Sequence, residues 1–344
     1  MPVTASDIAR KLGVSRQSVS KVLVGGKTNI RVSDQLATRI RLAADEMGYR
    51  PSMAARMIST GRTGSIDLLM SHLAGSSRLS PALMRGIHTE LAGHDIQVTV
   101  SQLPDMSLAT PATMPKILRE RSADGLLINF THHVPEALPA LIDKHRIPAV
   151  WLNTRQGKHC VYADEFDAYA RATQHLLELG HTQIAFYISS EAGHFSEADR
   201  AAGYTQAMHR AGLSERVHKA GAAEHPDPLD DDRLERAIAF LKHPDRPTGL
   251  LAYSHTDSII LATAAATLGL RLGHDLSLIG LGEEPRSPLG VSLTQVVVQQ
   301  EELGRAGVRR LLRLIETPTA ESPDRLIAAE LCVGRSTGPV APRT

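Results

Sequence analysis

The sequence predicts a small all-α head followed by a larger α/β body with parallel sheets. Three amphipathic helical patterns fill the first 49 residues, and from residue 66 onward apolar strand-like runs alternate with amphipathic helices. The length of 344 residues exceeds one typical core, and 42% hydrophobic with 22% charged residues is ordinary for a globular protein. The composition therefore excludes a disordered, collagenous or heptad-only chain.

The positive charge of the chain is concentrated in its head. Residues 1–63 hold eleven Lys and Arg against four Asp and Glu, a net +7, so the other 281 residues carry −6 to give the total of +1. A short basic segment on a mildly acidic body suggests a polyanionic partner for the head. A solvated basic helix face would give the same charge, so charge alone leaves both interpretations open.

The first predicted helix begins after Thr4, an N-cap residue, with Asp7 three residues later in a capping-box arrangement. The following residues up to Leu12 form one apolar stripe at helical spacing. Gly13 ends the helix because glycine readily takes the left-handed conformation of a tight turn.

Two more helices complete the predicted head. Ser15 caps the second helix, which turns an apolar stripe from Val19 to Leu23 inward. The third helix follows Ser33 and ends at Gly48. Two short helices joined by a tight turn that contains glycine describe a helix-turn-helix.

The second helix of such a unit enters the major groove with its N-terminal residues against the base edges. Arg16 and Gln17 occupy these positions and can read guanine and adenine through paired hydrogen bonds. Ser15, Ser18 and Lys21 suit phosphate oxygens, which fix position rather than sequence. This face is therefore predicted to read DNA, and a three-helix bundle with a hydrated polar face is the alternative.

The segments TASDIARKLGVSRQSVSKVL and IRLAADEMGYRPSMAARMISTGRT resemble the N-terminus of the lactose-repressor/galactose-repressor family of bacterial transcription regulators. The resemblance implies a homodimeric repressor on near-palindromic, double-stranded operator DNA. The residues expected at the DNA are Thr4, Ser15, Arg16, Gln17, Ser18, Lys21, Ser33, Ser52, Ala55, Arg56 and Ile58. The chain departs from the family at Val24, where asparagine is usual, and in a longer loop over residues 25–31.

A short hinge is expected between head and body. Pro51 ends the third helix because the residue before proline is pushed out of the helical region, and it is expected to open a new helix at its first position. A helix of about eight residues is marginal alone in water. The resemblance implies that this helix folds on operator DNA and pairs with its dimer mate, with Ile58 as a wedge in the minor groove. A plain linker helix is the alternative.

Strand and helix alternation in the body predicts parallel sheets covered by helices on both faces. The expected strands are 66–70, 96–100, 125–129, 149–152, 184–188, 249–253 and 276–280. Helices are expected between the strands, for example at 82–92, 168–179, 201–211, 234–241 and 258–268. About 280 residues exceed a single core, so two such sheets are expected.

The segments RSADGLLI, HLLELGHTQIAFYI and LGLRLGHDLSLIGLG resemble the same family. The resemblance implies a two-lobed, periplasmic-binding-protein-like core with three crossovers between its lobes. The expected domains are a head at 1–49, a hinge at 50–63 and an effector-binding and dimerisation domain at 64–344. The N-lobe is expected at about 64–162 and 292–322, and the C-lobe at about 163–291 and 323–344. The crossovers are expected near 162–164, 290–294 and 320–326.

A small-molecule effector is expected between the lobes, at the carboxyl ends of the strands. The residues that the resemblance places there are His72, Phe166, Asp167, Arg200, Tyr253, His255 and Glu283. Arg200 would bond effector oxygens, Asp167 would accept bonds from sugar hydroxyls and Phe166 would stack on a ring. A sugar is the family expectation, but His72, His255 and Glu283 replace the family's usual residues, so the effector's identity stays open. A surface ion pair of Arg200 and ordinary packing of Phe166 and His255 are the alternatives.

Other motifs are expected to be accidental. Only six residues follow the G-x-S-x-G match at 334–338, too few for the Asp and His that this motif requires downstream. The Gly-Lys-Thr at 26–28 lacks the rest of a phosphate-binding loop, and the sixteen histidines, the 132–133 pair included, show no metal spacing. We expect no catalytic residue, metal or cofactor.

The chain is expected to be soluble and cytoplasmic, with no membrane contact. No apolar run approaches the roughly 18–20 residues that span a bilayer, and the first fifteen residues lack the apolar region of a signal peptide. Cys160 and Cys332 are too few for a disulfide framework. A solute- or sugar-binding protein remains open but would need a signal peptide and no helix-turn-helix. A sugar-modifying α/β enzyme would need catalytic residues between the lobes.

Overall fold

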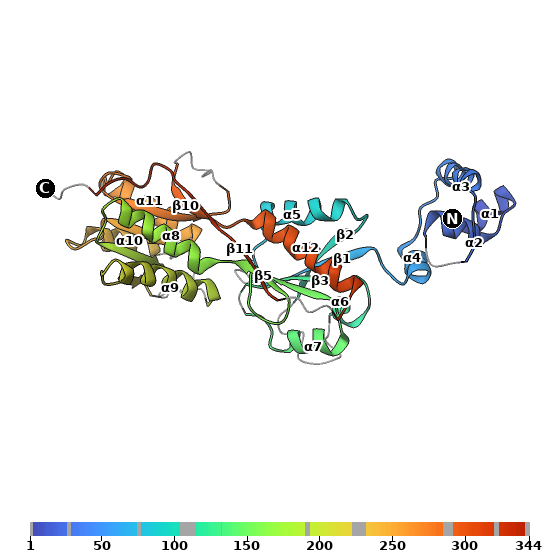
Figure 1. The fold of residues 1–344 in the computed structure, drawn as a ribbon, viewed down its shortest axis with the longest axis horizontal. Helices are drawn as coiled ribbons and strands as arrows, with labels where there is room; N and C mark the ends of the chain where they lie inside the picture. Colours follow the sequence, from blue (N-terminus) through green and yellow to red (C-terminus); the bar gives the residue numbers. More distant parts are fainter. Residues whose placement is uncertain are drawn as a thin grey trace.

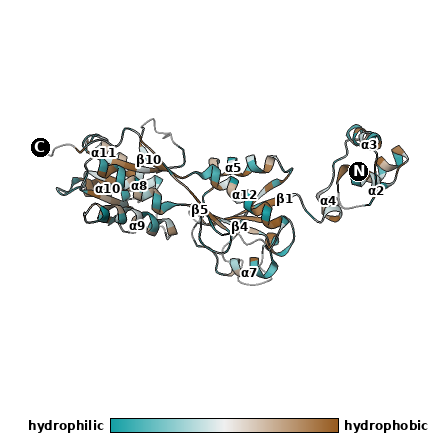
Figure 2. Cartoon of the chain, viewed as in Figure 1, coloured by the Kyte–Doolittle hydropathy of each residue, from teal (hydrophilic) through white to brown (hydrophobic). Residues whose placement is uncertain are grey.

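The computed structural model describes residues 3–25, 29–73, 77–103, 115–131, 133–189, 193–221, 232–284, 292–319 and 323–340. Figure 1 shows three parts along one axis: a helical head, an α/β lobe joined to it by a linker, and a second α/β lobe. The predicted fold class is confirmed. In Figure 2 most helices carry both hydrophilic and hydrophobic colours, as expected of helices that cover a core with one face.

The head contains α1 (Ala5–Leu12), α2 (Arg16–Leu23) and α3 (Asp34–Glu46). Its core is built around Ile8, Val19 and Ile40, which are completely buried. The predicted caps are confirmed: Thr4 and Asp7 form a capping box, and Gly13 ends α1 at φ 68°. Ser15 and Ser33 accept backbone N–H bonds at the starts of α2 and α3. The loop residues 26–28 lie outside the described part of the chain.

The linker helix α4 spans Met53–Thr60, so the prediction that Pro51 occupies its first position is wrong. The Arg56 N–H bonds to the Ser52 carbonyl oxygen at 3.0 Å. Ser52 is therefore the residue that precedes the helix, as serine's preference for N-cap positions favours, and Pro51 remains outside. The hydroxyl of Ser59 donates to the Gly25 carbonyl oxygen at 2.8 Å. This bond links α4 to the residue that follows the C-cap of α2.

The lobe nearest the head, the N-lobe, is built on a six-stranded parallel sheet of order β11-β5-β4-β3-β1-β2. Its strands are β1 (Ser65–Ser71), β2 (Gln97–Leu103), β3 (Leu126–Asn129), β4 (Ala149–Leu152), β5 (Cys160–Ala163) and β11 (Arg325–Ile327). Helices α5 (Pro81–Ala92) and α12 (Gln300–Glu316) pack on one face, and α6 (Lys116–Arg119) and α7 (Ala137–His145) pack on the other. Alternate residues of each strand supply the two cores, as the period of two requires.

The second lobe, the C-lobe, has a six-stranded sheet of order β12-β10-β9-β8-β6-β7. Its strands are β6 (Ile184–Ile188), β7 (Val217–Lys219), β8 (Gly249–Ala252), β9 (Ser277–Gly282), β10 (Thr294–Val297) and β12 (Glu330–Cys332), of which only β12 runs antiparallel to its neighbour. Helices α8 (Glu165–Glu178) and α9 (Phe195–Arg210) cover one face, and α10 (Arg233–Lys242) and α11 (His255–Thr267) cover the other.

Two of the three predicted crossovers are misplaced. The first falls at residue 164, between β5 and α8, within the expected 162–164. The second lies at residues 298–299, after β10, and not at 290–294, because β10 pairs in parallel with β9 and completes the C-lobe sheet. The third lies at residues 328–329, and not at 320–326, because β11 still pairs with β5 of the N-lobe. The expected lobe boundaries at 291/292 and 322/323 are therefore wrong by several residues.

Within the described ranges, no helix is long and apolar enough to cross a membrane.

A buried histidine gives the C-lobe a pH dependence. His181 is 3% exposed and lies within hydrogen-bond distance of the hydroxyls of Thr248 and Ser277 at 2.9 Å. Burial lowers its pKa below the usual value. The unfolded chain therefore binds more protons than the folded chain as pH falls through about 6.5, so the stabilisation is complete above that pH and declines below it.

We expect the thermal midpoint to fall between pH 7.5 and pH 5.5, and to fall less in the His181→Gln variant. Some dependence will remain, since burial also lowers the pKa of His218. Differential scanning fluorimetry across this range measures the slope, with the exposed His88→Gln as the matched control. A slope in His181→Gln equal to that of the wild type would contradict the assignment.

Candidate DNA interface and effector site

The N-terminal end of α2 presents the base-reading residues predicted from the sequence. Arg16 and Gln17 are exposed, because Val19 holds the opposite side of the helix in the head core. Neither side chain forms a hydrogen bond or ion pair with any residue that the structure describes. The Ser15 and Ser18 hydroxyls lie 2.9 Å apart at the start of the helix. The side chains of Arg16 and Gln17 can therefore reach a duplex without first breaking a hydrogen bond or ion pair to the described residues.

The other residues predicted at the DNA fall into two groups. Thr4 and Ser33 act as helix caps, and the Thr4 hydroxyl donates to the Asp7 carboxylate at 2.6 Å, so each is already engaged within the head. Ile58, in contrast, has no capping role in the head: its side chain is 88% exposed on α4. The side chain of Ala55 lies outside the described part of the chain. DNA contact by these residues stays a prediction.

Arg56 connects the linker helix to the N-lobe. Its guanidinium lies 3.4 Å from the carboxylate of Asp95, in the turn before β2. The same side chain fills the space over Gly64, where a Cβ would lie 3.0 Å from Nη1. In this structure Arg56 therefore contacts the body, and its contact with DNA stays a prediction.

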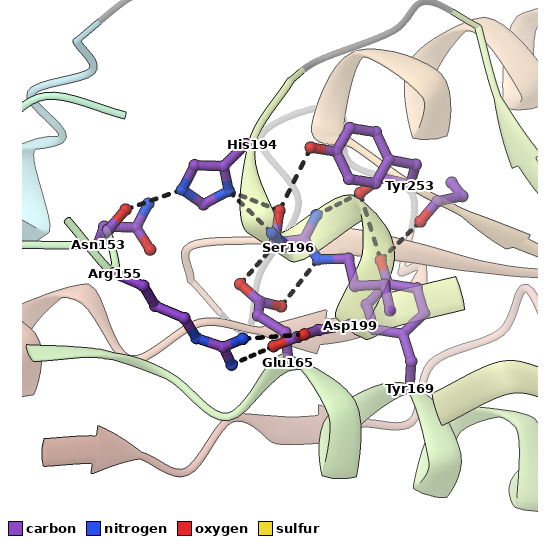
Figure 3. Close-up of polar contacts among 10 residues, drawn as sticks. Asn153, Arg155, Glu165, Tyr169, His194, Ser196, Asp199 and Tyr253 are labelled. Carbon is purple, nitrogen blue, oxygen red and sulfur yellow. Dashed lines mark hydrogen bonds and ion pairs between the residues drawn. The ribbon is translucent and has the colours of Figure 1, made fainter. Parts of the chain in front are cut away.

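Between the lobes, Arg200 of α9 lies in a buried polar cluster of the C-lobe (Figure 3). Its guanidinium makes two bonds of 2.8 Å to the Glu165 carboxylate and donates to the Tyr253 carbonyl oxygen. The rings of Tyr169 and Tyr253 flank it, with centroids at 5.4 and 5.0 Å. Desolvation lowers the pKa of Arg200, but the Glu165 carboxylate outweighs it and the net pKa is raised. The alternative interpretation, in which Arg200 forms a surface ion pair, is wrong in one respect: Arg200 does form an ion pair, but the pair is buried.

Glu165 was not predicted. It is 1% exposed and stands at the first position of α8, directly after the first crossover. Asp257 of α11 was missed as well; it is buried, accepts bonds from Ser189 and Ser254, and burial raises its pKa. The only sequence signal for Asp257 was the capping-box spacing from Ser254.

A chain of polar bonds joins this cluster to the N-lobe (Figure 3). His194 Nε2 donates to the Asn153 carbonyl oxygen at 2.8 Å, across the lobe boundary. Because this nitrogen carries the proton, Nδ1 of His194 accepts from the Ser196 hydroxyl at 2.7 Å. The Tyr253 hydroxyl then donates to Ser196 Oγ at 3.3 Å, and the Tyr253 carbonyl oxygen accepts from Arg200.

Further contacts hold the lobes together on both sides of this network. Arg155 of the N-lobe pairs with Asp199 of α9, and its guanidinium lies 4.6 Å from the Phe195 ring centroid. On the other side, Arg78 pairs with Glu283 at 3.1 Å and Arg85 with Glu284 at 3.1 Å. Glu283 also borders a cavity of about 440 Å³ between α5, α12 and the end of β9. Opening or closing the lobes must break or remake these bonds.

The remaining residues predicted at the effector do not all converge. His72 and His255 each place Nδ1 3.2 Å from a backbone carbonyl oxygen, of Leu103 and Leu281 respectively. Asp167 is exposed and pairs with Arg171 one helical turn later. Phe166 is 36% exposed. The structure therefore brings Arg200 and Tyr253 into one cluster, and their effector contacts, like those of the other five, stay predictions.

The serine of the G-x-S-x-G match has a structural role. Ser336 of the G-x-S-x-G match is buried and donates to the Leu278 carbonyl oxygen at 2.6 Å while accepting from the Thr294 N–H. Among the residues that the structure describes, no group of three or more His, Cys, Asp or Glu side chains could hold a metal ion.

Comparisons with known proteins agree with this geometry. Residues 4–52 match the family described as bacterial regulatory proteins, lacI family, and residues 173–337 match the periplasmic binding protein-like domain. The chain is 28% identical to the HTH-type transcriptional regulator PtxS of Pseudomonas aeruginosa over 342 residues, 98% of this chain and 96% of the relative. It is 26% identical to the HTH-type transcriptional repressor PurR of Vibrio vulnificus, over 91% and 92%. Its fold is similar to that of the Lac repressor dimer bound to operator and the anti-inducer ONPF, with a TM-score of 0.75, 23% identity and coverage of 98% and 100%.

Proposed function

Because this chain belongs to the lacI family of bacterial regulatory proteins, its function is DNA-binding transcriptional regulation, and we propose that it is a homodimeric repressor controlled by a small molecule. Each head reads one half-site of a near-palindromic operator, and paired α4 helices bend the centre of the site. Since its target is the chromosome, we place the protein in the cytoplasm.

The observation that carries the proposal is the exposed end of α2. The exposed side chains of Arg16 and Gln17 stand at the position from which a recognition helix contacts base edges. The head and hinge together, residues 1–63, carry a net +7, which supplies the non-specific attraction to phosphate. Ile58, 88% exposed on the linker helix, is the apolar side chain suited to enter between base steps.

A sugar or sugar derivative bound between the lobes is the proposed effector. One relative of similar fold is described as a CelR–cellobiose complex, and another from Enterococcus faecium has bound ribose. In this chain, an effector that reached Arg200 would replace the bond between Arg200 and the Tyr253 carbonyl oxygen. It would thereby affect the hydrogen-bonded path that leads from Tyr253 to Asn153 of the N-lobe. The resulting change in lobe angle alters the order of α4, a coupling free energy of about 1–3 kcal/mol that acts in both directions.

The test is selection of operators from the source genome with the purified protein. Sequencing of bound fragments should yield a near-palindromic consensus, and titrations at increasing salt should show affinity falling steeply, because phosphate contacts release counterions. If no fragment binds with a strong inverse salt dependence, the proposal fails. Candidate sugars are then added to the operator complex, and turnover assays on the same sugars separate a regulator from an enzyme.

Replacing Ile58 by alanine should weaken operator binding about tenfold, roughly 1.4 kcal/mol, and reduce DNA bending. Alanine keeps the helix but removes the apolar wedge. Circular-permutation gel shifts measure the bend and the affinity together. Met57→Ala is the matched control from the same helix, since Met57 is also exposed at 37%; equal effects of the two variants would remove the wedge role.

A further inference from the structure

A cationic cavity lies in the N-lobe at the amino ends of β3 and β4, the opposite end of the sheet from the effector site. Its volume is about 450 Å³. The apolar floor includes Leu126, Ile147 and Pro148, and the rim carries Arg62, Arg119, Arg121 and Arg146. In Figure 1 this region, marked by α6 and the end of α12, lies on the side of the N-lobe that faces the linker and the head.

Among the described residues, the carboxylates at this cavity form an ion pair with only one of its arginines, Arg119. Asp124 is buried and accepts the backbone N–H groups of Thr63 and Gly64 at 2.8 and 2.9 Å. Glu120 lies 3.6 Å from the cationic groups of both Lys116 and Arg119. Arg121 and Arg146 consequently have no ion pair among the described residues, although they border the same apolar floor.

The left-handed backbone conformation of Arg146 supports a role for its side chain in ligand binding at this cavity. Arg146 ends α7 in the left-handed conformation, at φ 52° and ψ 42°. Glycine or asparagine usually occupies such a position because a Cβ is costly there. An arginine at this point places its side chain at the border of two adjoining cavities, the second of about 630 Å³.

We propose that this cavity binds a small organic phosphate. The guanidinium forks of Arg121 and Arg146 suit the paired oxygens of a phosphate group, and the apolar floor suits the body of the molecule. A volume of about 450 Å³ is within the ordinary range for small-molecule sites. The site is separate from the effector position at Arg200.

The cavity also contacts the segment that joins the head to the body. Arg62, on its rim, donates to the Ile315 carbonyl oxygen at 3.2 Å, and Asp124 holds the next two residues of the linker. A phosphate that draws on Arg62 therefore acts directly on the linker that positions α4. This regulatory step rests on the proposed function, whereas binding itself does not.

Calorimetric titration of the full chain with phenyl phosphate tests the binding. We expect saturable binding that neither phenol nor inorganic phosphate alone matches, and at least tenfold weaker binding in Arg121→Gln and Arg146→Gln. Arg146→Gly keeps the left-handed turn without strain and should show the same loss, which separates binding from folding. Arg210→Gln, an exposed arginine at the end of α9, is the matched control. Absence of saturable binding, or unchanged affinity in these variants, overturns the proposal.

Operator titrations with the same variants separate a phosphate ligand from contact with DNA phosphates. If the site takes a small ligand, phenyl phosphate changes operator affinity in the wild type but not in Arg121→Gln. If instead the variants weaken operator binding without ligand and reduce its salt slope by about one per arginine, these arginines are DNA contacts and the proposal is wrong. Because the calorimetry uses no DNA, its result stands even if no operator is found.

Discussion

Replacing Arg16 by alanine should weaken operator binding by about 1–3 kcal/mol per half-site and relax the base preference at one position of each half-site. Arg16 stands at the first position of α2, and its exposed side chain forms no hydrogen bond or ion pair with the described residues. Its removal should therefore leave the head folded, because the helix is held from the other side by Val19. The loss arises from the missing paired hydrogen bonds to a base edge.

Binding selections with randomised half-sites measure this effect, with two comparisons. Arg10→Ala is the matched control, since Arg10 is 79% exposed on α1 and, among the described residues, its side chain pairs with Asp7 alone. Lys21→Ala should weaken binding to all sequences equally and lower the salt slope by about one. If Arg16→Ala keeps the wild-type preference at every position, α2 does not read bases through this residue.

Replacing Glu165 by alanine should lower the free energy of unfolding by about 3–5 kcal/mol, since it leaves the buried charge of Arg200 without its partner. Both side chains are nearly inaccessible, at 1% and 7%. Tyr169 and Tyr253 enclose the guanidinium, so water cannot replace the carboxylate without repacking the cluster. Urea denaturation followed by circular dichroism measures the loss.

Two further variants separate burial from charge. Asp167→Ala, two residues along the same helix, removes an exposed pair with Arg171 and should change stability little. The double variant Glu165→Leu with Arg200→Met should recover most of the lost stability, because an apolar pair avoids the desolvation cost. Equal destabilisation by Glu165→Ala and Asp167→Ala would mean that the buried pair contributes no more than a surface pair.

The sequence placed several elements at or near their observed bounds, although α12, a helix of 17 residues, was not among the helices named from the sequence. Strands β4 and β6 were placed at their observed bounds, and α5 within one residue. The short strands β7, β11 and β12, of three residues each, were not predicted because a period of two needs more residues to be recognised. The third crossover was misplaced because β11 was not predicted, and the second because the four-residue β10 was not predicted either.

The candidate site was predicted less completely than the fold, for a different reason. Caps such as Thr4 and Ser15 depend on neighbours three residues away, so local sequence reveals them. The partnership of Arg200 with Glu165 joins residues 35 apart, and the bond from His194 to Asn153 crosses between lobes. Such contacts depend on how two sheets are placed, which no short-range pattern encodes.

The anchorage of the linker determines where the head can turn. The two carboxylate oxygens of Asp124 accept hydrogen bonds from the consecutive N–H groups of Thr63 and Gly64. These bonds fix the chain to the sheet from Thr63 onward. Before Thr63, Gly61 takes φ 73°, a conformation that glycine adopts at no steric cost. Gly61 is thus the hinge residue between α4 and the part of the chain that is fixed to the sheet. A rotation of the N-lobe is therefore transmitted to α4 through only two residues, Gly61 and Arg62, and so short a segment can absorb little of it.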